Sequence, residues 1–219
     1  MVDYAQLRTK MVDNQLRTND ITDLRILGAM GEVAREHFVP EDKRSLAYID
    51  EDLPVLDDGS RKSAKPHIFG KMVQLAAFAK DDVVLVVGAS SGYGVSVISK
   101  LCDSVVGIEQ DAKLVEIASR NLVETGIENA AVVEATHKLG YPAEAPYDVI
   151  FVDGAVEEIS SELFEQLKDG GRLVAVEGLG GAGVANLYQK SAGTVSSRFG
   201  FNANAPHLPG FEQELEFKF

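Results

Sequence analysis

The sequence Val83-Val84-Leu85-Val86-Val87-Gly88-Ala89-Ser90-Ser91-Gly92-Tyr93-Gly94 contains the transition that decides the fold. Five apolar residues, four of them β-branched, stop at a glycine-rich turn, and a segment compatible with a helix follows. Because no polar residue alternates with the apolar ones, the pattern predicts a strand buried on both faces, as in a parallel sheet. The glycines allow the backbone to approach a ligand at the start of the helix, where free amide groups point outward.

A second apolar segment, Val105-Val106-Gly107-Ile108, ends on Glu109. An acidic side chain at the end of the second strand of a βαβ unit can accept hydrogen bonds from ribose hydroxyls. Residues 83–110 therefore predict a site for a nucleoside-type cofactor and leave the identity of that cofactor open.

The segments that follow alternate in type, which predicts an α/β fold with a doubly wound, mostly parallel sheet. The expected strands after the first two are residues 130–133, 147–153, 172–177, 185–191, 194–202 and 213–219. The expected helices are residues 68–79, 95–101, 112–124 and 159–167, with a largely helical stretch over residues 1–35. Ala192-Gly193 is short enough for a hairpin turn, so the C-terminal edge of the sheet should be antiparallel. Residues 55–69 are polar and turn-rich, as expected of a loop over the cofactor cleft.

Length and charge narrow the range of functions. A chain of 219 residues suits one α/β domain of ordinary size with a short appended segment. The balance of 21 basic and 34 acidic residues gives a net charge of −13, which argues against nucleic acids and anionic membranes as partners. Neither a membrane span nor a signal peptide is visible, so we expect a cytoplasmic protein. One cysteine, Cys102, and four scattered histidines show no metal-site spacing, so no metal is expected.

Short segments in a fixed order point to a known family. In the first third of the chain they are Met11-Val12-Asp13-Asn14-Gln15-Leu16-Arg17, Ile21-Thr22-Asp23, Arg35-Glu36-His37-Phe38-Val39-Pro40, Leu46-Ala47-Tyr48 and Leu53-Pro54. Later they are Leu139-Gly140-Tyr141-Pro142 and Gln166-Leu167-Lys168-Asp169-Gly170-Gly171-Arg172-Leu173-Val174. From about residue 11 to residue 176 the chain resembles the protein-L-isoaspartate O-methyltransferase family.

This resemblance implies a class I, Rossmann-like methyltransferase fold, with a seven-stranded sheet, an antiparallel C-terminal edge and an N-terminal helical extension. Residues 1–60 would form a helical segment packed on the core, and residues 61–219 the methyltransferase domain of what is a single domain overall. The implied reaction moves a methyl group from S-adenosylmethionine to an isoaspartyl carboxylate in a damaged protein or peptide. A carboxylate is already a nucleophile at neutral pH, so alignment and exclusion of water would supply most of the catalysis.

The resemblance also implies site residues. The expected cofactor-binding residues are Gly88, Ala89, Ser90, Ser91, Gly92, Glu109, Gln110 and Thr136. The expected substrate loop contains Ala64, Lys65, Pro66 and His67. The family has a hydroxyl residue at the position of Ala64, so the neighbouring Ser63 is the candidate catalytic residue.

Four positions depart from the family pattern. Val86 replaces an acidic residue, Ser90 a glycine and Thr136 an acidic residue that recognises the adenine amino group, while Ala64 replaces the hydroxyl residue. Each lost charge-assisted hydrogen bond typically costs about 1.5–3 kcal/mol. An alternative function is therefore that of a non-catalytic family member with weakened or lost cofactor binding.

A third interpretation starts from the glycine turn alone, which is similar to that of short-chain dehydrogenases that bind NAD(P). An NAD-linked oxidoreductase of that class uses a Tyr-x-x-x-Lys pair, and none of the six tyrosines has a lysine four residues later. The turn is also preceded by 87 residues, whereas those enzymes place it near the start of the chain. This interpretation is the weakest of the three.

Overall fold

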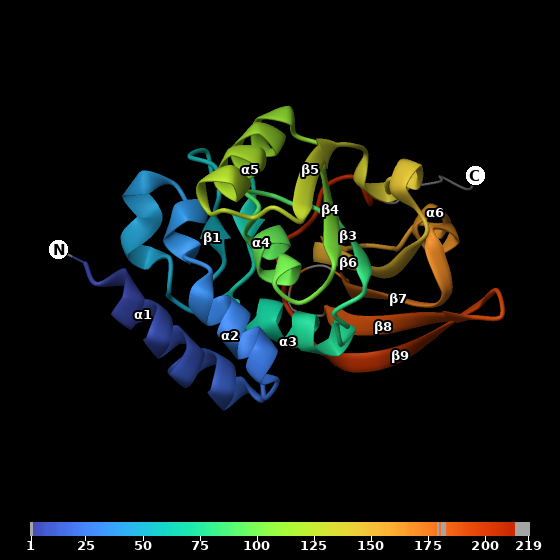
Figure 1. The fold of residues 1–219 in the computed structure, drawn as a ribbon, viewed down its shortest axis with the longest axis horizontal. Helices are drawn as coiled ribbons and strands as arrows, with labels where there is room; N and C mark the ends of the chain where they lie inside the picture. Colours follow the sequence, from blue (N-terminus) through green and yellow to red (C-terminus); the bar gives the residue numbers. More distant parts are fainter. Residues whose placement is uncertain (1, 179, 181–182, 213–219) are drawn as a thin grey trace, which may run out of the picture.

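The computed structural model describes residues 2–178, 180 and 183–212, and Figure 1 shows how they are layered. A seven-stranded sheet has the order β5-β4-β3-β6-β7-β8-β9. The strands are β3 (Val83–Val87), β4 (Ser104–Glu109), β5 (Ala130–Glu134), β6 (Tyr147–Val156), β7 (Leu167–Glu177), β8 (Val184–Ser191) and β9 (Thr194–Asn202). β3 to β7 are parallel, whereas β8 and β9 pair antiparallel at one edge. The predicted fold class is confirmed.

Helices surround this sheet (Figure 1). They are α1 (Tyr4–Met11), α2 (Leu24–Glu32), α3 (Pro66–Ala76), α4 (Tyr93–Ser99), α5 (Ala112–Glu124) and α6 (Ser161–Glu165). Single-turn segments lie between them: a π-helical turn at Val12–Leu16 and 3-10 turns at Arg17–Asn19, Arg35–Phe38, Glu41–Leu46, His137–Leu139 and Pro142–Glu144. A separate two-stranded ladder pairs β1 (Leu53–Pro54) with β2 (Lys62–Ser63).

The alternation of side chains along β3 explains why its sequence is apolar throughout. Val84 and Val86 point into a core that contains buried residues of α2, α3, α4 and α5. Leu85 and Val87 point to the other face, where Leu163 of α6 and Leu208 pack. Both faces of the central strand are therefore covered, as expected for a parallel strand.

The strand order changes direction beside β3, because β4 lies on one side of it and β6 on the other. In open α/β sheets, ligands bind outside the carboxyl ends of the strands at such a switch point. The glycine turn after Val87 and the end of β4 at Glu109 both lie at this edge. This geometry makes the crevice beside β3 the candidate functional site.

Some predicted boundaries are wrong. The helix expected over 159–167 is only the five-residue α6. The following strand begins at Leu167, and Tyr147 N–H donates to the Gln166 carbonyl at 2.9 Å just before it. α3 begins at Pro66, so the expected loop over 55–69 ends earlier and includes the short β2. The strand expected over 213–219 lies outside the described residues. Among the described residues, no helix has both the length and the apolar character needed to cross a membrane.

Candidate active site

The turn between β3 and α4 is tightly wound and buried. Gly88 and Gly92 have φ values of +86° and +93°, a region that favours glycine. Ser90 also has a positive φ, +53°, which strains a residue with a Cβ atom. The Ser90 N–H donates to Glu109 Oε2 at 3.0 Å, and this charge-assisted bond helps to hold the serine in its strained conformation.

Glu109 is the centre of the site. Its side chain is 1% exposed, and both carboxylate oxygens have partners. Arg61 Nη2 donates to Oε2 at 2.9 Å, while the N–H groups of Gln110 and Asp111 donate to Oε1 at 3.0 and 3.3 Å. Together with the Ser90 amide, these contacts surround the carboxylate with donors.

His137 makes a further contact with Glu109. Its Nε2 lies 3.2 Å from Glu109 Oε1, and its Nδ1 lies 2.9 Å from the Pro209 carbonyl oxygen. The Nε2 contact is a close approach without hydrogen-bond geometry, so the Pro209 carbonyl is the hydrogen-bonding neighbour of the ring. Burial alone would raise the pKa of Glu109, but the contact with His137 and the charges of Arg61 and His137 outweigh burial and lower this pKa to about 2. Glu109 is therefore ionised at neutral pH.

The segment around Leu208 lies across the crevice. Ala155 N–H donates to the Pro206 carbonyl at 2.7 Å, and Leu208 N–H donates to the Ala155 carbonyl at 2.8 Å. The Leu208 side chain is fully buried and rests on the glycine turn, since a Cβ atom at Gly88 would lie 2.6 Å from Leu208 Cδ1. In this conformation Leu208 covers Gly88 at the switch point.

A second group of polar side chains lies next to the turn. Lys62, Ser63, Ala89, Ser90, Ser91, Tyr93, Gly94 and Asp153 line a cavity of about 10 Å³. A cavity of this size holds about one water molecule and no organic ligand. The Ser90 and Tyr93 hydroxyls are buried beside it without a hydrogen-bond partner among the described residues.

Arg35 and Asp153 set the charge around this cavity. The Arg35 guanidinium is 1% exposed, lies 4.7 Å from the Tyr93 ring centre, and donates to the Ala64 carbonyl at 2.8 Å and to Ser63 Oγ at 3.3 Å. These contacts fix the position of Ser63. Burial raises the pKa of Asp153 to about 6, although the charges of Arg61 and Arg35 act in the opposite direction.

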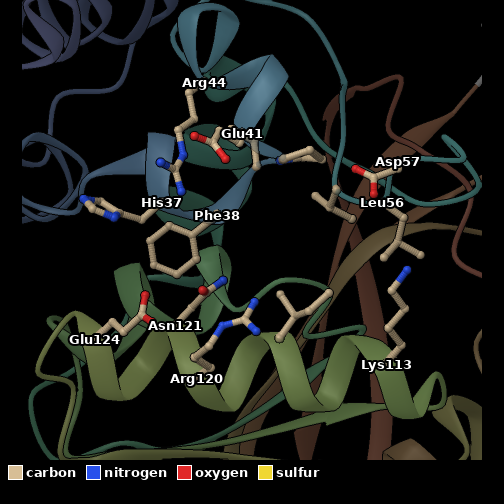
Figure 2. Close-up of a pocket in the computed structure, with 14 residues that line it drawn as sticks. His37, Phe38, Glu41, Arg44, Leu56, Asp57, Lys113, Arg120, Asn121 and Glu124 are labelled. Atoms are coloured by element: carbon tan, nitrogen blue, oxygen red, sulfur yellow. The ribbon is translucent and has the colours of Figure 1, made fainter.

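A larger cavity, of about 350 Å³, lies elsewhere, between α5 and residues 37–57 (Figure 2). Arg120, Asn121 and Lys113 reach into it from α5, while Arg44 and Glu41 face them from the other side. Its lining is polar and of mixed charge and includes neither Glu109 nor a residue of the glycine turn. Asn121 connects the two regions, because its Nδ2 donates to the Ser91 carbonyl at 2.9 Å.

Comparison with known proteins decides the family. The family model for protein-L-isoaspartate (D-aspartate) O-methyltransferase matches residues 6–202. The chain is 42% identical over 175 residues to a protein-L-isoaspartate O-methyltransferase from Opitutus terrae, covering 78% of this chain and 74% of that protein. The chain belongs to this family.

Other relatives agree with this assignment. A second bacterial member, protein-L-isoaspartate O-methyltransferase 2 from Anaeromyxobacter sp., is 41% identical over 171 residues, covering 78% of this chain and 70% of that protein. A solved protein-L-isoaspartate O-methyltransferase structure superposes with a TM-score of 0.81 at 29% identity, covering 93% of this chain and 67% of that one. A Plasmodium falciparum structure, described as a putative member in complex with S-adenosyl-L-homocysteine, shares the fold at 19% identity, with a TM-score of 0.77 and coverage of 96% and 100%.

The structure brings most of the predicted cofactor residues of this methyltransferase family member together. The turn lies against the end of β4, since Gly88 N–H and Ala89 N–H donate to the Ile108 carbonyl at 3.0 and 2.9 Å. Ser90 N–H and Gln110 N–H donate to the Glu109 carboxylate, and the Gln110 side chain faces Gly210. Thr136 is exposed and precedes the 3-10 turn that carries His137. The assignment of these residues to the cofactor stays a prediction.

The predicted substrate loop is divided between two environments. Ser63 lines the small cavity, whereas Ala64 is 4% exposed and belongs to the apolar core. Lys65 N–H donates to Asp52 at 2.9 Å, and His67 Nδ1 lies 2.6 Å from Asp50 Oδ2, so His67 is paired with Asp50. Val86 is fully buried in the apolar core.

Sequence reasoning missed Arg61, His137, Asp153 and Leu208. A signal existed for Asp153, because it follows the apolar residues of a central strand just as Glu109 does. His137 lies next to the predicted Thr136, but nothing local distinguished it. Arg61 and Leu208 come from a loop and an irregular segment, and only the tertiary structure brings them to Glu109 and Gly88.

Proposed function

We propose that this protein is an S-adenosylmethionine-dependent methyltransferase that acts on isoaspartyl carboxylates in damaged proteins or peptides. The observation that carries the proposal is the ionised carboxylate of Glu109 at the carboxyl end of β4, which accepts a hydrogen bond from the glycine turn that follows β3. Membership of the protein-L-isoaspartate O-methyltransferase family supports the same reaction. The family assignment leaves the NAD-linked oxidoreductase without support.

The chemistry of the site suits the cofactor, although two side chains of the protein now contact the groups that would bind it. A buried, ionised carboxylate is the acceptor that a ribose diol requires, and Glu109 supplies it. Arg61 now occupies one oxygen of that acceptor, and Leu208 covers Gly88. Glu109 and the amides of the glycine turn would hold the cofactor after these two side chains move.

The reaction needs little acid–base chemistry from the protein. The cofactor supplies an electrophilic methyl group, and the substrate carboxylate is already ionised at neutral pH. Ser63, held by Arg35, is the residue we assign to hydrogen bonding with that carboxylate. The remaining requirement is alignment in a site closed to water, to which the loop and the Leu208 segment contribute.

A second candidate function is that of a non-catalytic family member. The contacts of Leu208 with Gly88 and of Arg61 with Glu109 favour it, together with Ser90 and Thr136 at positions where the family resemblance implies other residues. Under this alternative the closed conformation described above would be the working state, and the purified protein would transfer no methyl group.

The two candidates are separated by a methyl-transfer assay. Purified full-length protein is incubated with methyl-labelled S-adenosylmethionine and either an isoaspartyl peptide or the aspartyl peptide of the same sequence. We expect label only in the isoaspartyl peptide. Transfer to neither peptide would contradict the proposed function and favour the non-catalytic candidate.

The role of Ser63 is tested in the same assay. Ser63→Ala should lower kcat/KM roughly tenfold or more, because a hydrogen bond to a charged group is lost. The matched control is Ser60→Ala, an exposed serine of the same loop whose hydroxyl bonds to Asp58, and we expect it to retain activity. Equal activity of the two variants would contradict the assignment of Ser63.

A further inference from the structure

We propose that Arg61 is a built-in competitor of the cofactor: its guanidinium occupies on Glu109 the place of the ribose hydroxyls, and cofactor affinity depends on displacing it. This inference rests on the proposed function, since it concerns the same site. A cofactor-binding residue raises the affinity for the cofactor, whereas Arg61 lowers it.

The contact between Arg61 and Glu109 joins a hydrogen-bond donor to a buried carboxylate. A guanidinium and a ribose diol both offer hydrogen-bond donors to a carboxylate, so they suit the same acceptor. Arg61 Nη2 donates to Glu109 Oε2 at 2.9 Å, and the two side chains are 9% and 1% exposed. A diol cannot reach the same oxygen from the crevice while this contact persists.

Glu109 holds the Arg61 guanidinium incompletely. An arginine that binds a carboxylate with its full fork makes two parallel bonds. Here one bond is present, and Arg61 Nε is buried without a partner among the described residues. Loss of this contact therefore sacrifices less than loss of a two-bond pair, and the Ser90 amide and His137 would still face the carboxylate.

The loop of residues 55–61, which carries Arg61, is lightly attached to the rest of the protein. The loop 55–61 is closed by the two-residue ladder of β1 and β2 and by one bond from Val55 N–H to the Arg61 carbonyl at 3.0 Å. Its tip is polar, and Gly59 has a φ of +71°. Val55 and Leu56 pack against Leu114 of α5, so this end can stay anchored while the tip and Arg61 move.

The test is isothermal titration of full-length protein with S-adenosylhomocysteine. Wild type is compared with Arg61→Gln, which removes the charge, and with Arg61→Lys, which keeps the charge but loses the fork. The control is Arg17→Gln, which breaks an exposed pair with Asp13 of 3.3 Å. We expect roughly tenfold tighter binding by Arg61→Gln, an intermediate gain for Arg61→Lys and no change for the control.

Each outcome separates this inference from the proposed function. If wild type binds and Arg61→Gln binds equally or more weakly, competition by Arg61 is refuted and the proposed function stands. If only the Arg61 variants bind, the inference is supported and the cofactor site is shown to be latent. If no protein binds at millimolar ligand, both fail. Circular dichroism of each variant verifies folding, and should Arg61→Gln not fold, the Arg61→Lys comparison decides.

Discussion

Glu109 is a carboxylate with five polar neighbours and almost no contact with water, and this determines how the protein responds to acid. Its pKa of about 2 lies below the ordinary value of 4.5. The folded state therefore releases this proton more readily than the unfolded state, and the resulting stability is present above pH 4.5. It is lost as the pH falls from 4.5 towards 2.

Substitution of Glu109 tests this account. Glu109→Gln leaves the Arg61 guanidinium buried without its opposite charge, which typically costs about 3–5 kcal/mol of stability. The variant should also lose the share of acid sensitivity that Glu109 contributes below pH 4.5. Urea unfolding at several pH values measures both effects, and equal stability of variant and wild type would contradict the burial of a charged cluster.

Asp153 should change the stability with pH in the direction opposite to Glu109. Its pKa of about 6 is raised above the ordinary 3.8, so the folded state holds the proton more tightly and stability falls as the pH rises from about 4 to about 6. Asp153→Asn should remove this fall and stabilise the protein at pH 7.5 by up to about 3 kcal/mol, less the lost attraction to Arg61 and Arg35.

The same unfolding measurement, made at pH 4.5, 6 and 7.5, checks the prediction for Asp153. Asp103→Asn, at an exposed site, is the matched control and should leave the pH dependence of wild type unchanged. A variant at Asp153 that is less stable than wild type at pH 7.5 would show that the carboxylate is favourably paired.

At the residue scale, the sequence predicted that Glu109 and the glycine turn lie together. Glu109 and the glycine turn follow from the βαβ pattern, because strand ends and turns are local features. Arg61 and His137 could not be predicted, since they reach Glu109 through a loop and a 3-10 turn whose paths depend on packing. Ser90 stands where the family resemblance implies a glycine, and the structure adds that its own amide bonds to Glu109.

Among the elements, α5 supports the glycine turn from behind. Asn121 is buried on this helix and donates to the Ser91 carbonyl at 2.9 Å, and a Cβ atom at Gly92 would lie 3.3 Å from Ala118. The turn is thus supported by a helix that begins three residues after Glu109, and its N-cap Asp111 accepts a bond from Lys113 N–H at 2.9 Å.

Asn121→Ala should loosen this support. It leaves the Ser91 carbonyl without its donor, which typically costs about 1–3 kcal/mol. The Gly92 amide, bonded to the Ala89 carbonyl at 2.8 Å, should also exchange its hydrogen faster. The control is Ser119→Ala on the same helix. Unchanged exchange at Gly92 in the Asn121 variant would show that the turn is rigid without this bond.

The strands were easier to predict than the ends of helices. β3, β4 and β8 lie within a residue of their expected positions, because long apolar or alternating runs define them. The segment 159–167 carries apolar residues compatible with a helix, yet parallel pairing of Leu167 with Tyr147 ends α6 early. The π-helical turn at Val12–Leu16 has no distinct sequence signal, and packing of Val12 and Leu16 in the core accompanies it.

At the scale of the whole molecule, a net charge of −13 produces self-repulsion that destabilises the compact state. Added salt screens this repulsion, and it also weakens exposed pairs such as Arg17–Asp13, which are worth little. We therefore expect the Tm to rise by a few degrees between about 20 mM and about 500 mM KCl. Circular dichroism measures the Tm at each salt concentration. A fall in Tm would show that exposed ion pairs outweigh the repulsion.

The apolar core on one face of the sheet, opposite to α6, contains residues of α1 and α2 together with residues of β3, β6 and β7. Because these residues form one cluster, we propose that the N-terminal helices unfold together with this face of the sheet. A chain that began at residue 61 would leave an apolar surface of α3 and α4 open to water. Newly made protein should therefore complete its fold only when both ends of this core are present.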